Sequence, residues 1–244
     1  MPPGPRRLLL FDIDGTLVRW GGVAGRVFAR ALQKIVGRSV DTAGYSFAGR
    51  TDLEIARTLL RRAGIAPDQL DESVQATIEE YLRGFADLVH DQTKATLCPG
   101  VRSLLQRLDA EPMLTLGLLT GNVSAGADLK LGHFDIRHYF RLGAFGSDSE
   151  DRNDLLPIAL RRARERTGIE FQPRQVVIIG DTPRDIECAR AHGAMSVGVA
   201  TGPYTREELQ TAGALHVVDD LADTGRVARL LLDGTALTDR AGEL

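Results

Sequence analysis

Short, continuous apolar runs recur along the 244-residue chain. They lie at residues 8–11, 114–119, 142–145, 176–179 and 196–200, and a weaker run lies at 215–218. An uninterrupted short apolar run is typical of a strand that is buried on both faces of a parallel sheet. Helical patterns separate these runs, at residues 101–108, 155–166 and 183–192. Strands that alternate with helices predict an α/β protein with a doubly wound parallel sheet.

The stretch from about Val23 to His90 interrupts this alternation, because it contains no convincing buried strand. Apolar residues recur there at helical spacing, which predicts helices over 23–36, 52–63 and 70–89. We therefore predict an all-helical insert at residues 19–91. It would interrupt a discontinuous α/β core that is formed by residues 1–18 and 92–244.

Composition excludes several classes of protein. The chain has 30 basic and 33 acidic side chains, so its net charge is only −3. This small net charge argues against a protein that binds nucleic acid or a membrane surface through its overall charge. We find no apolar run of bilayer length and no signal-peptide pattern, and two cysteines, Cys98 and Cys188, make neither a disulfide framework nor a zinc site. We therefore expect a cytoplasmic protein with reduced cysteines. Lysine is scarce, with Lys34, Lys94 and Lys130 the only three.

Polar residues follow four of the apolar runs, where an open parallel sheet binds its ligands. The first run is followed by Asp12 and Asp14, the second by Thr120, Gly121 and Asn122, the third by Asp148 and Arg152, and the fourth by Asp181 and Asp185. Clustered carboxylates repel one another unless a cation lies among them, and hard oxygen ligands suit Mg²⁺. Because Mg²⁺ also neutralises phosphate oxygens, the pattern indicates phosphoryl transfer.

The chemistry of the residue types suggests a role for each. Asp12 and Asp14 are two residues apart at a strand end and can face the same side. Asp12 could attack phosphorus and form an aspartyl phosphate, while Asp14 handles the leaving-group proton. The Thr120 hydroxyl could donate to a phosphate oxygen, helped by backbone N–H groups at the start of the next helix. Arg152 could balance the negative charge of the phosphate.

Three motifs together resemble the haloacid dehalogenase-like superfamily of phosphohydrolases. They are Asp-Ile-Asp-Gly-Thr at 12–16, Leu-Leu-Thr-Gly-Asn at 118–122 and Gly-Asp-Thr-Pro-Arg-Asp at 180–185. The resemblance spans about Leu8 to Thr201 and implies a Rossmann-like core with a helical cap domain. It implies that Asp12 is the nucleophile and Asp14 the general acid/base. It also implies that Mg²⁺ is held by Asp12, the Asp14 backbone carbonyl and Asp181, with Asp185 as a ligand or a water-mediated support.

The segment Ala48–Thr51 resembles the cap loop of phosphoglycolate phosphatases and β-phosphoglucomutases, in which an arginine helps to bind substrate. This implies that Arg50 joins the substrate-binding residues Thr120, Gly121, Asn122 and Arg152, although a solvated cap arginine is an equal alternative. We expect a monomer or homodimer that hydrolyses a small phosphorylated metabolite, phosphoglycolate or a sugar phosphate. The alternatives are a phosphomutase, a haloacid dehalogenase, which Asp14 disfavours, and a non-catalytic binding protein.

The family has a further motif between the third strand and the helix that follows it, where a lysine is usual. The sequence departs from the family pattern there. The chain has no lysine after Lys130, which precedes the third strand and is expected on the helix after Thr120. We therefore predict that the cation of the site is an arginine and assign the role to Arg152. Arg161 and Arg162 are the next candidates. Three residues also have structural alternatives: Thr120 and Asp185 as helix caps and Asp148 as a turn residue.

Overall fold

The computed structural model describes residues 6–89 and 95–233. Its main sheet has six parallel strands in the order β5–β4–β1–β6–β7–β8. They are β1 (Arg7–Phe11), β4 (Leu114–Thr120), β5 (Leu142–Phe145), β6 (Val176–Gly180), β7 (Met195–Val199) and β8 (His216–Val218). The predicted α/β fold class is confirmed. The order of strands reverses beside β1, so the ligand crevice of such a sheet lies at the carboxyl ends of β1 and its neighbours.

The two faces of the sheet are covered by different helices. Leu9 and Phe11 of β1 face a layer that contains α4 (Val101–Asp109), α5 (Ser124–Gly132) and α9 (Thr224–Asp233). Leu8 and Leu10 face the opposite layer, made by α6 (Leu155–Thr167) and α7 (Pro183–Ala191). A short helix, α8 (Arg206–Thr211), packs against β8. Because strand residues alternate between faces, one apolar run serves both layers.

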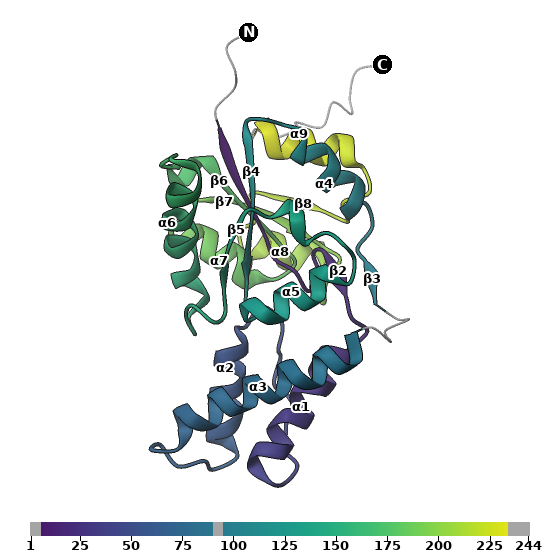
Figure 1. The fold of residues 1–244 in the computed structure, drawn as a ribbon. Coiled ribbons are helices and arrows are strands. Elements are labelled where there is room, and N and C mark those ends of the chain that lie inside the picture. Colours follow the sequence, from purple (N-terminus) through teal and green to yellow (C-terminus); the bar gives the residue numbers. More distant parts are fainter. Residues whose placement is uncertain (1–5, 90–94, 234–244) are drawn as a thin grey trace.

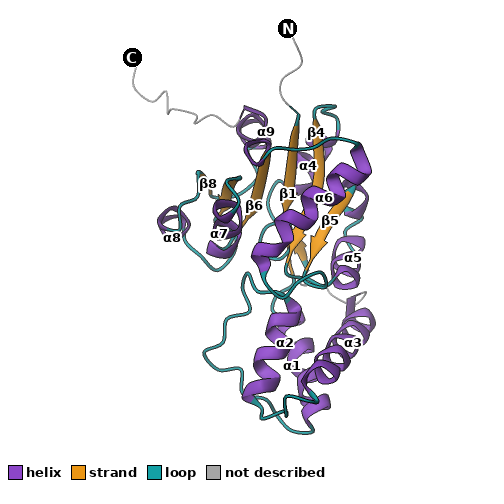
Figure 2. Ribbon diagram, turned by 90° about the vertical axis from the view of Figure 1, so that its left-hand side faces the viewer, coloured by secondary structure: helices purple, strands orange, loops and turns teal. Residues whose placement is uncertain are grey.

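Three further helices, which we call the cap, lie beyond the carboxyl ends of the strands (Figures 1 and 2). They are α1 (Val23–Val36), α2 (Asp52–Arg62) and α3 (Leu70–Val89), and α3 packs against both of the others. Their extents agree with the predicted helices. The predicted core boundary at 91/92 and the chain end after 233 lie outside the described residues, so the division into 19–91 and the core stays a prediction.

The connection between core and cap contains elements that the sequence pattern did not reveal. Strand β2 (Val18–Arg19) pairs antiparallel with β3 (Thr96–Leu97) beside the cap. Two residues are too few to form a recognisable alternation. Gly21 and Gly22 then take φ values of 53° and 75°, which glycine adopts at little steric cost, and α1 begins directly after them. Within the described residues, no helix is both long and apolar enough to cross a membrane.

The packing of α4 on the sheet leads to a stability prediction. Leu104 is fully buried in this layer, so Leu104→Ala leaves a cavity and should lower the free energy of unfolding by about 2–5 kcal/mol. Leu215 is 52% exposed, and Leu215→Ala should change it by no more than about 0.5 kcal/mol. Urea titrations of the two variants measure the difference. Equal losses would contradict the assignment of α4 to the core.

Candidate active site

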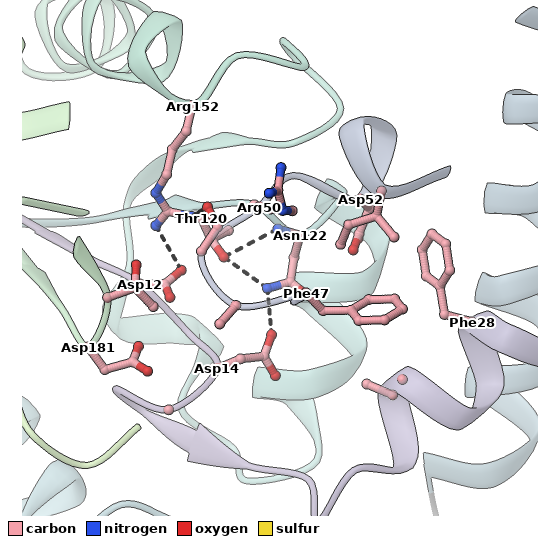
Figure 3. Close-up of a pocket in the computed structure, with 18 of the residues that line it drawn as sticks. Asp12, Asp14, Phe28, Phe47, Arg50, Asp52, Thr120, Asn122, Arg152 and Asp181 are labelled. Carbon is pink, nitrogen blue, oxygen red and sulfur yellow. Dashed lines mark hydrogen bonds and ion pairs between the residues drawn. The ribbon is translucent and has the colours of Figure 1, made fainter. Parts of the chain in front are cut away.

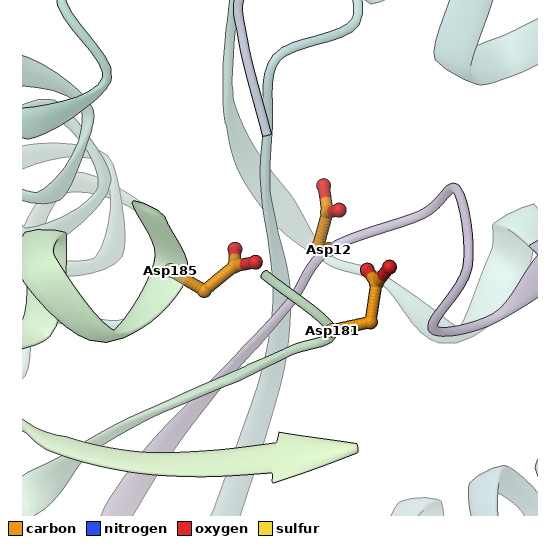
Figure 4. Close-up of side chains that lie close together, drawn as sticks. All are labelled: Asp12, Asp181 and Asp185. Atoms are coloured by element: carbon orange, nitrogen blue, oxygen red, sulfur yellow. The ribbon is translucent and has the colours of Figure 1, made fainter. Parts of the chain in front are cut away.

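Three buried carboxylates meet where β1 and β6 end and α7 begins (Figure 4). Asp12, Asp181 and Asp185 each place an oxygen within 4.8 Å of the other two. Asp185 also completes a capping box, because one of its oxygens accepts from the Thr182 N–H at 3.1 Å and from the Thr182 hydroxyl at 2.7 Å. Asp185 therefore caps α7 and also lies in the carboxylate cluster, so the two interpretations of this residue are compatible.

Arg152 lies in a short 3₁₀ turn, Arg152–Asp154, between β5 and α6. Its buried guanidinium is 2.5 Å from Asp185 Oδ1 and 3.2 Å from Asp12 Oδ1. The arginine that the sequence assigned to the site therefore contacts the predicted nucleophile and one predicted metal ligand. Arg162, a fallback candidate, instead pairs with Asp148, which also accepts from the Phe145 N–H. The structure thus supports the turn interpretation of Asp148.

The electrostatics of these carboxylates are unfavourable without a further cation. Burial raises the pKa of Asp12 to about 6; Arg152 acts in the opposite direction, while Asp185 and Asp14 add to the rise. Burial and the charge of Asp12 likewise raise the pKa of Asp181 well above its usual range. The single positive charge of Arg152 therefore neutralises only part of the negative charge of the three carboxylates. A hard divalent cation such as Mg²⁺ fits this set of buried oxygen donors.

Close backbone packing holds Asp181 in place. Gly15 has φ +84°, and a Cβ atom there would lie 2.2 Å from Asp181 Oδ2. The Thr16 hydroxyl donates to Asp181 Oδ1 at 3.0 Å. Gly15 and Thr16 of the first motif thus hold Asp181 in position. The sequence did not reveal this contact of Thr16.

A second polar cluster surrounds Asp14 (Figure 3). The Lys130 ammonium donates to Asp14 Oδ2 and to Asn122 Oδ1, both at 2.6 Å. The Asn122 amide donates to Asp14 at 2.8 Å and to the Thr120 hydroxyl oxygen at 2.9 Å. Thr120 ends β4 and α5 begins only at Ser124, so Thr120 is not the helix cap. The carboxylate of Asp14 thus lies outside the cluster formed by Asp12 and its neighbours.

The expectation that arginine alone supplies the positive charge is therefore wrong. Lys130 does lie on the helix after Thr120, but its side chain is 3% exposed and reaches the site. Nearby acids outweigh the effect of burial and raise the pKa of Lys130, so the ammonium stays charged. Gly126 and Ala127, both buried, precede it by four and three residues. That spacing places Lys130 on the inward face of α5 and could have identified it.

The cap closes over these clusters through the start of α2. The Asp52 N–H donates to the Gly121 carbonyl at 2.8 Å, and the Val123 N–H donates to Asp52 Oδ2 at 2.8 Å. Arg152 also donates to the Gly49 carbonyl of the cap loop at 3.2 Å. A Cβ atom on Gly121 would lie 1.9 Å from the backbone oxygen of residue 50, so only glycine permits this contact. Asp52 thus joins the cap to the core, a contact that the sequence did not reveal.

Arg50, which the resemblance assigns to substrate binding, has its charged group bound by residues of the cap. Its guanidinium pairs with Glu54, donates to the Ser46 carbonyl at 3.0 Å and lies 4.8 Å from the centre of the Tyr45 ring. Glu54 also accepts from Arg184 at 3.2 Å. Arg50 lines the cavity between core and cap, but its guanidinium makes no hydrogen bond to the strand-end residues among the described contacts.

A cavity of about 260 Å³ lies between these groups. The predicted site residues that line it are Asp12, Asp14, Arg50, Thr120, Gly121, Asn122, Arg152 and Asp181. Side chains from the cap complete the lining. The structure thus brings together, around one partly open cavity, a carboxylate at the end of β1, hydroxyl and amide groups at the end of β4, and two buried cations. Such a space can exclude bulk water from an anionic reaction.

Comparison with known proteins agrees with this arrangement. The chain matches the family model of haloacid dehalogenase-like hydrolases over residues 9–199. A phosphoglycolate phosphatase from Rhodospirillum rubrum is 30% identical over 227 residues, which cover 90% of this chain and 89% of that protein. The solved structure of a hydrolase from Pseudomonas syringae has a TM-score of 0.69 at 23% identity and covers 91% of this chain and 97% of that chain. CbbY from Rhodobacter sphaeroides, solved with phosphate, has a TM-score of 0.64 at 20% identity, with coverage of 90% and 96%.

The fold and the site define a phosphohydrolase in which strand-end carboxylates lie under a helical cap. The chain belongs to the haloacid dehalogenase-like hydrolase family. The resemblance carried by the three motifs is therefore confirmed, while the roles of the individual residues stay predictions.

The contact between Lys130 and Asp14 leads to a kinetic prediction. Lys130→Met should lower kcat roughly ten- to a hundred-fold and change KM little, because the ammonium orients Asp14 and Asn122. Steady-state kinetics with p-nitrophenyl phosphate measure both constants. Lys34→Met is the matched control, because Lys34 is exposed on the cap and pairs with Glu80. An unchanged kcat for Lys130→Met would exclude this positioning role.

The burial of Asp52 leads to a pH prediction. Burial raises its pKa to about 6, although Lys130 and the Val123 N–H oppose the shift. Between about pH 4 and 6 the folded protein keeps a proton that the unfolded chain, with a carboxyl pKa of about 3.9, releases. Wild-type stability should therefore fall relative to Asp52→Asn as pH rises through this window. The difference in Tm between the two proteins in EDTA measures this. The exposed Asp87→Asn should show no such trend, and a pH-independent difference for Asp52→Asn would refute the prediction.

Proposed function

We propose that the protein is a Mg²⁺-dependent phosphomonoesterase that works through an aspartyl phosphate on Asp12. The observation that carries this proposal is the position of Asp12. It lines the cavity between core and cap beside the guanidinium of Arg152, while the Lys130 ammonium holds Asp14 at the same cavity. A nucleophile and a separate acid/base group are what hydrolysis in two displacement steps requires.

In the first step an oxygen of Asp12 forms a bond to phosphorus as the ester P–O bond breaks. Asp14 gives its proton to the leaving oxygen, which departs as the alcohol. In the second step Asp14 takes a proton from water, whose oxygen attacks phosphorus. The acyl-phosphate P–O bond then breaks and releases phosphate, and both carboxyl groups return to their starting forms. The Thr120 hydroxyl donates to a phosphate oxygen throughout, and the positive charge of Arg152, held beside Asp12, stabilises the phosphate.

Asp12, Asp181 and the Asp14 backbone carbonyl would hold the Mg²⁺ ion, and Asp185 would support it directly or through water. The ion would supply positive charge against the phosphate oxygens and the nucleophile. Arg152 would retain its contacts with Asp12 and Asp185 and keep these carboxylates oriented.

The same residues could serve a phosphomutase, but the cavity favours hydrolysis. A mutase needs a second phosphate position at the cap end. Among the described residues that line the cavity, the cations near the cap are Arg50 and Lys130, and both already bind carboxylates. Phosphoglycolate, the substrate in the name of the Rhodospirillum rubrum relative, and a sugar phosphate are the first esters to test.

Asp12→Asn should lower kcat by roughly a thousand-fold or more, because an amide cannot act as the nucleophile. Phosphate release from a panel of phosphorylated metabolites measures the loss. EDTA should abolish wild-type activity and Mg²⁺ should restore it. The exposed Asp87→Asn is the control and should retain activity. Metal-dependent turnover that survives Asp12→Asn would exclude the mechanism, and activity unaffected by EDTA would exclude the metal.

A further inference from the structure

The cavity has two chemically different ends (Figure 3). Asp12, Arg152 and Asp181 lie together at one end. Phe28 and Phe47 of the cap lie at the opposite end, which we call the apolar end. The cap also contributes Ala24, Ile55 and Tyr81 to the lining of the cavity. The ring of Phe28 lies 6.1 Å from the ring of Phe47 and 5.0 Å from that of Tyr81. An ester bound with its phosphate beside Asp12 therefore extends its alcohol part toward aromatic surface.

The charged groups near the apolar end are already occupied. Arg50 is held by Glu54 and the Ser46 carbonyl, and Lys130 is held by Asp14 and Asn122. The carboxylate of Asp52 accepts from the Val123 N–H. An anionic or polyhydroxylated alcohol would have to break these pairs or bury polar groups without partners, which is costly.

The size of the cavity also favours an alcohol larger than glycolate. A cavity of about 150 Å³ lined by apolar side chains holds a benzene molecule. The cavity here measures about 260 Å³, enough for a phosphate group together with one ring. An apolar group that leaves water and enters such a cavity stabilises the bound complex in proportion to the apolar area that it buries.

We propose that the substrate is a phosphate monoester of an alcohol with a ring-sized apolar group, and that Phe47 is the residue that selects it. This rests on the proposed phosphatase function and narrows its substrate class. Phe47 is only partly buried, in the loop before α2, so one side of its ring can contact a ligand. The other aromatic contact of Phe47 is with Tyr45, at 5.7 Å.

Gly25 offers an independent way to fill the same space. It lines the cavity from α1, and a Cβ atom there would meet no other heavy atom within 4 Å. Leucine is a better helix former than glycine, so Gly25→Leu should fold and place its side chain in the cavity. This variant tests the proposal even if Phe47→Ser fails to fold.

The experiment compares kcat/KM for benzyl phosphate, 2-phosphoglycolate and glucose 6-phosphate in the presence of Mg²⁺. All three are esters of primary alcohols, so differences in leaving-group reactivity are small. The wild type should prefer benzyl phosphate by tenfold or more. Phe47→Ser and Gly25→Leu should each lower kcat/KM for benzyl phosphate by about tenfold and that for 2-phosphoglycolate by less than threefold. The matched control is Arg83→Gln, at an exposed arginine of α3 that pairs with Glu80, and it should change the benzyl phosphate value less than threefold.

The outcomes separate the two proposals. A preference for 2-phosphoglycolate that Arg50→Gln abolishes would show that Arg50 leaves Glu54 to bind a carboxylate, and it would overturn the apolar substrate while leaving the phosphatase intact. A preference for glucose 6-phosphate would have the same consequence. Failure to hydrolyse any of the three esters, or a wider metabolite panel, would overturn the phosphatase proposal and the substrate class with it.

Discussion

The ion pairs of Arg152 with Asp12 and Asp185 are the interaction on which the site depends. Removing one partner of a buried ion pair leaves an uncompensated charge, which is far costlier than losing a surface pair. The planar guanidinium also donates to the Leu119 carbonyl at 3.3 Å and to the Gly49 carbonyl of the cap loop at 3.2 Å. Asp12, Asp185 and the Leu119 carbonyl lie around Nη2, and Nη1 donates to the Gly49 carbonyl, so one guanidinium serves the carboxylates and the cap loop through two nitrogens, whereas a lysine ammonium has only one.

The two buried cations divide the carboxylates into two groups. Arg152 accompanies Asp12 and Asp185 in the sheet crevice, and Lys130 accompanies Asp14 on the side toward the cap. The charge of Asp14 adds to the rise in the pKa of Asp12, and Lys130 lies beside that charge. In the proposed mechanism the first group would hold the cation and Asp14 would face the leaving group. Nucleophilic attack and proton transfer would then take place in different local environments.

The sequence predicted those parts of the molecule that follow from local pattern. Buried strands and amphipathic helices have a period of their own, and residues after parallel strands must meet at one edge of the sheet. The contacts of Asp52 were missed because they depend on how the start of α2 packs on the core, which no local period encodes. Lys130 was missed although its spacing from Gly126 and Ala127 places it on the inward face of α5. Arg50 was assigned from a motif, but its charge is engaged by Glu54, four residues along. The strands β2 and β3 were missed because two residues show no alternation.

Cap closure and substrate choice are properties of the same segment. The loop before α2 contributes Phe47 to the apolar end, and its next residues press against Gly121 so closely that a Cβ atom would collide with the backbone. The contact of Asp52 with Val123 then fixes the start of α2 over the core. An alcohol that fills the apolar end would contact Phe47 and so add apolar contacts to the docked loop. An ester too small to reach Phe47 would lack these contacts.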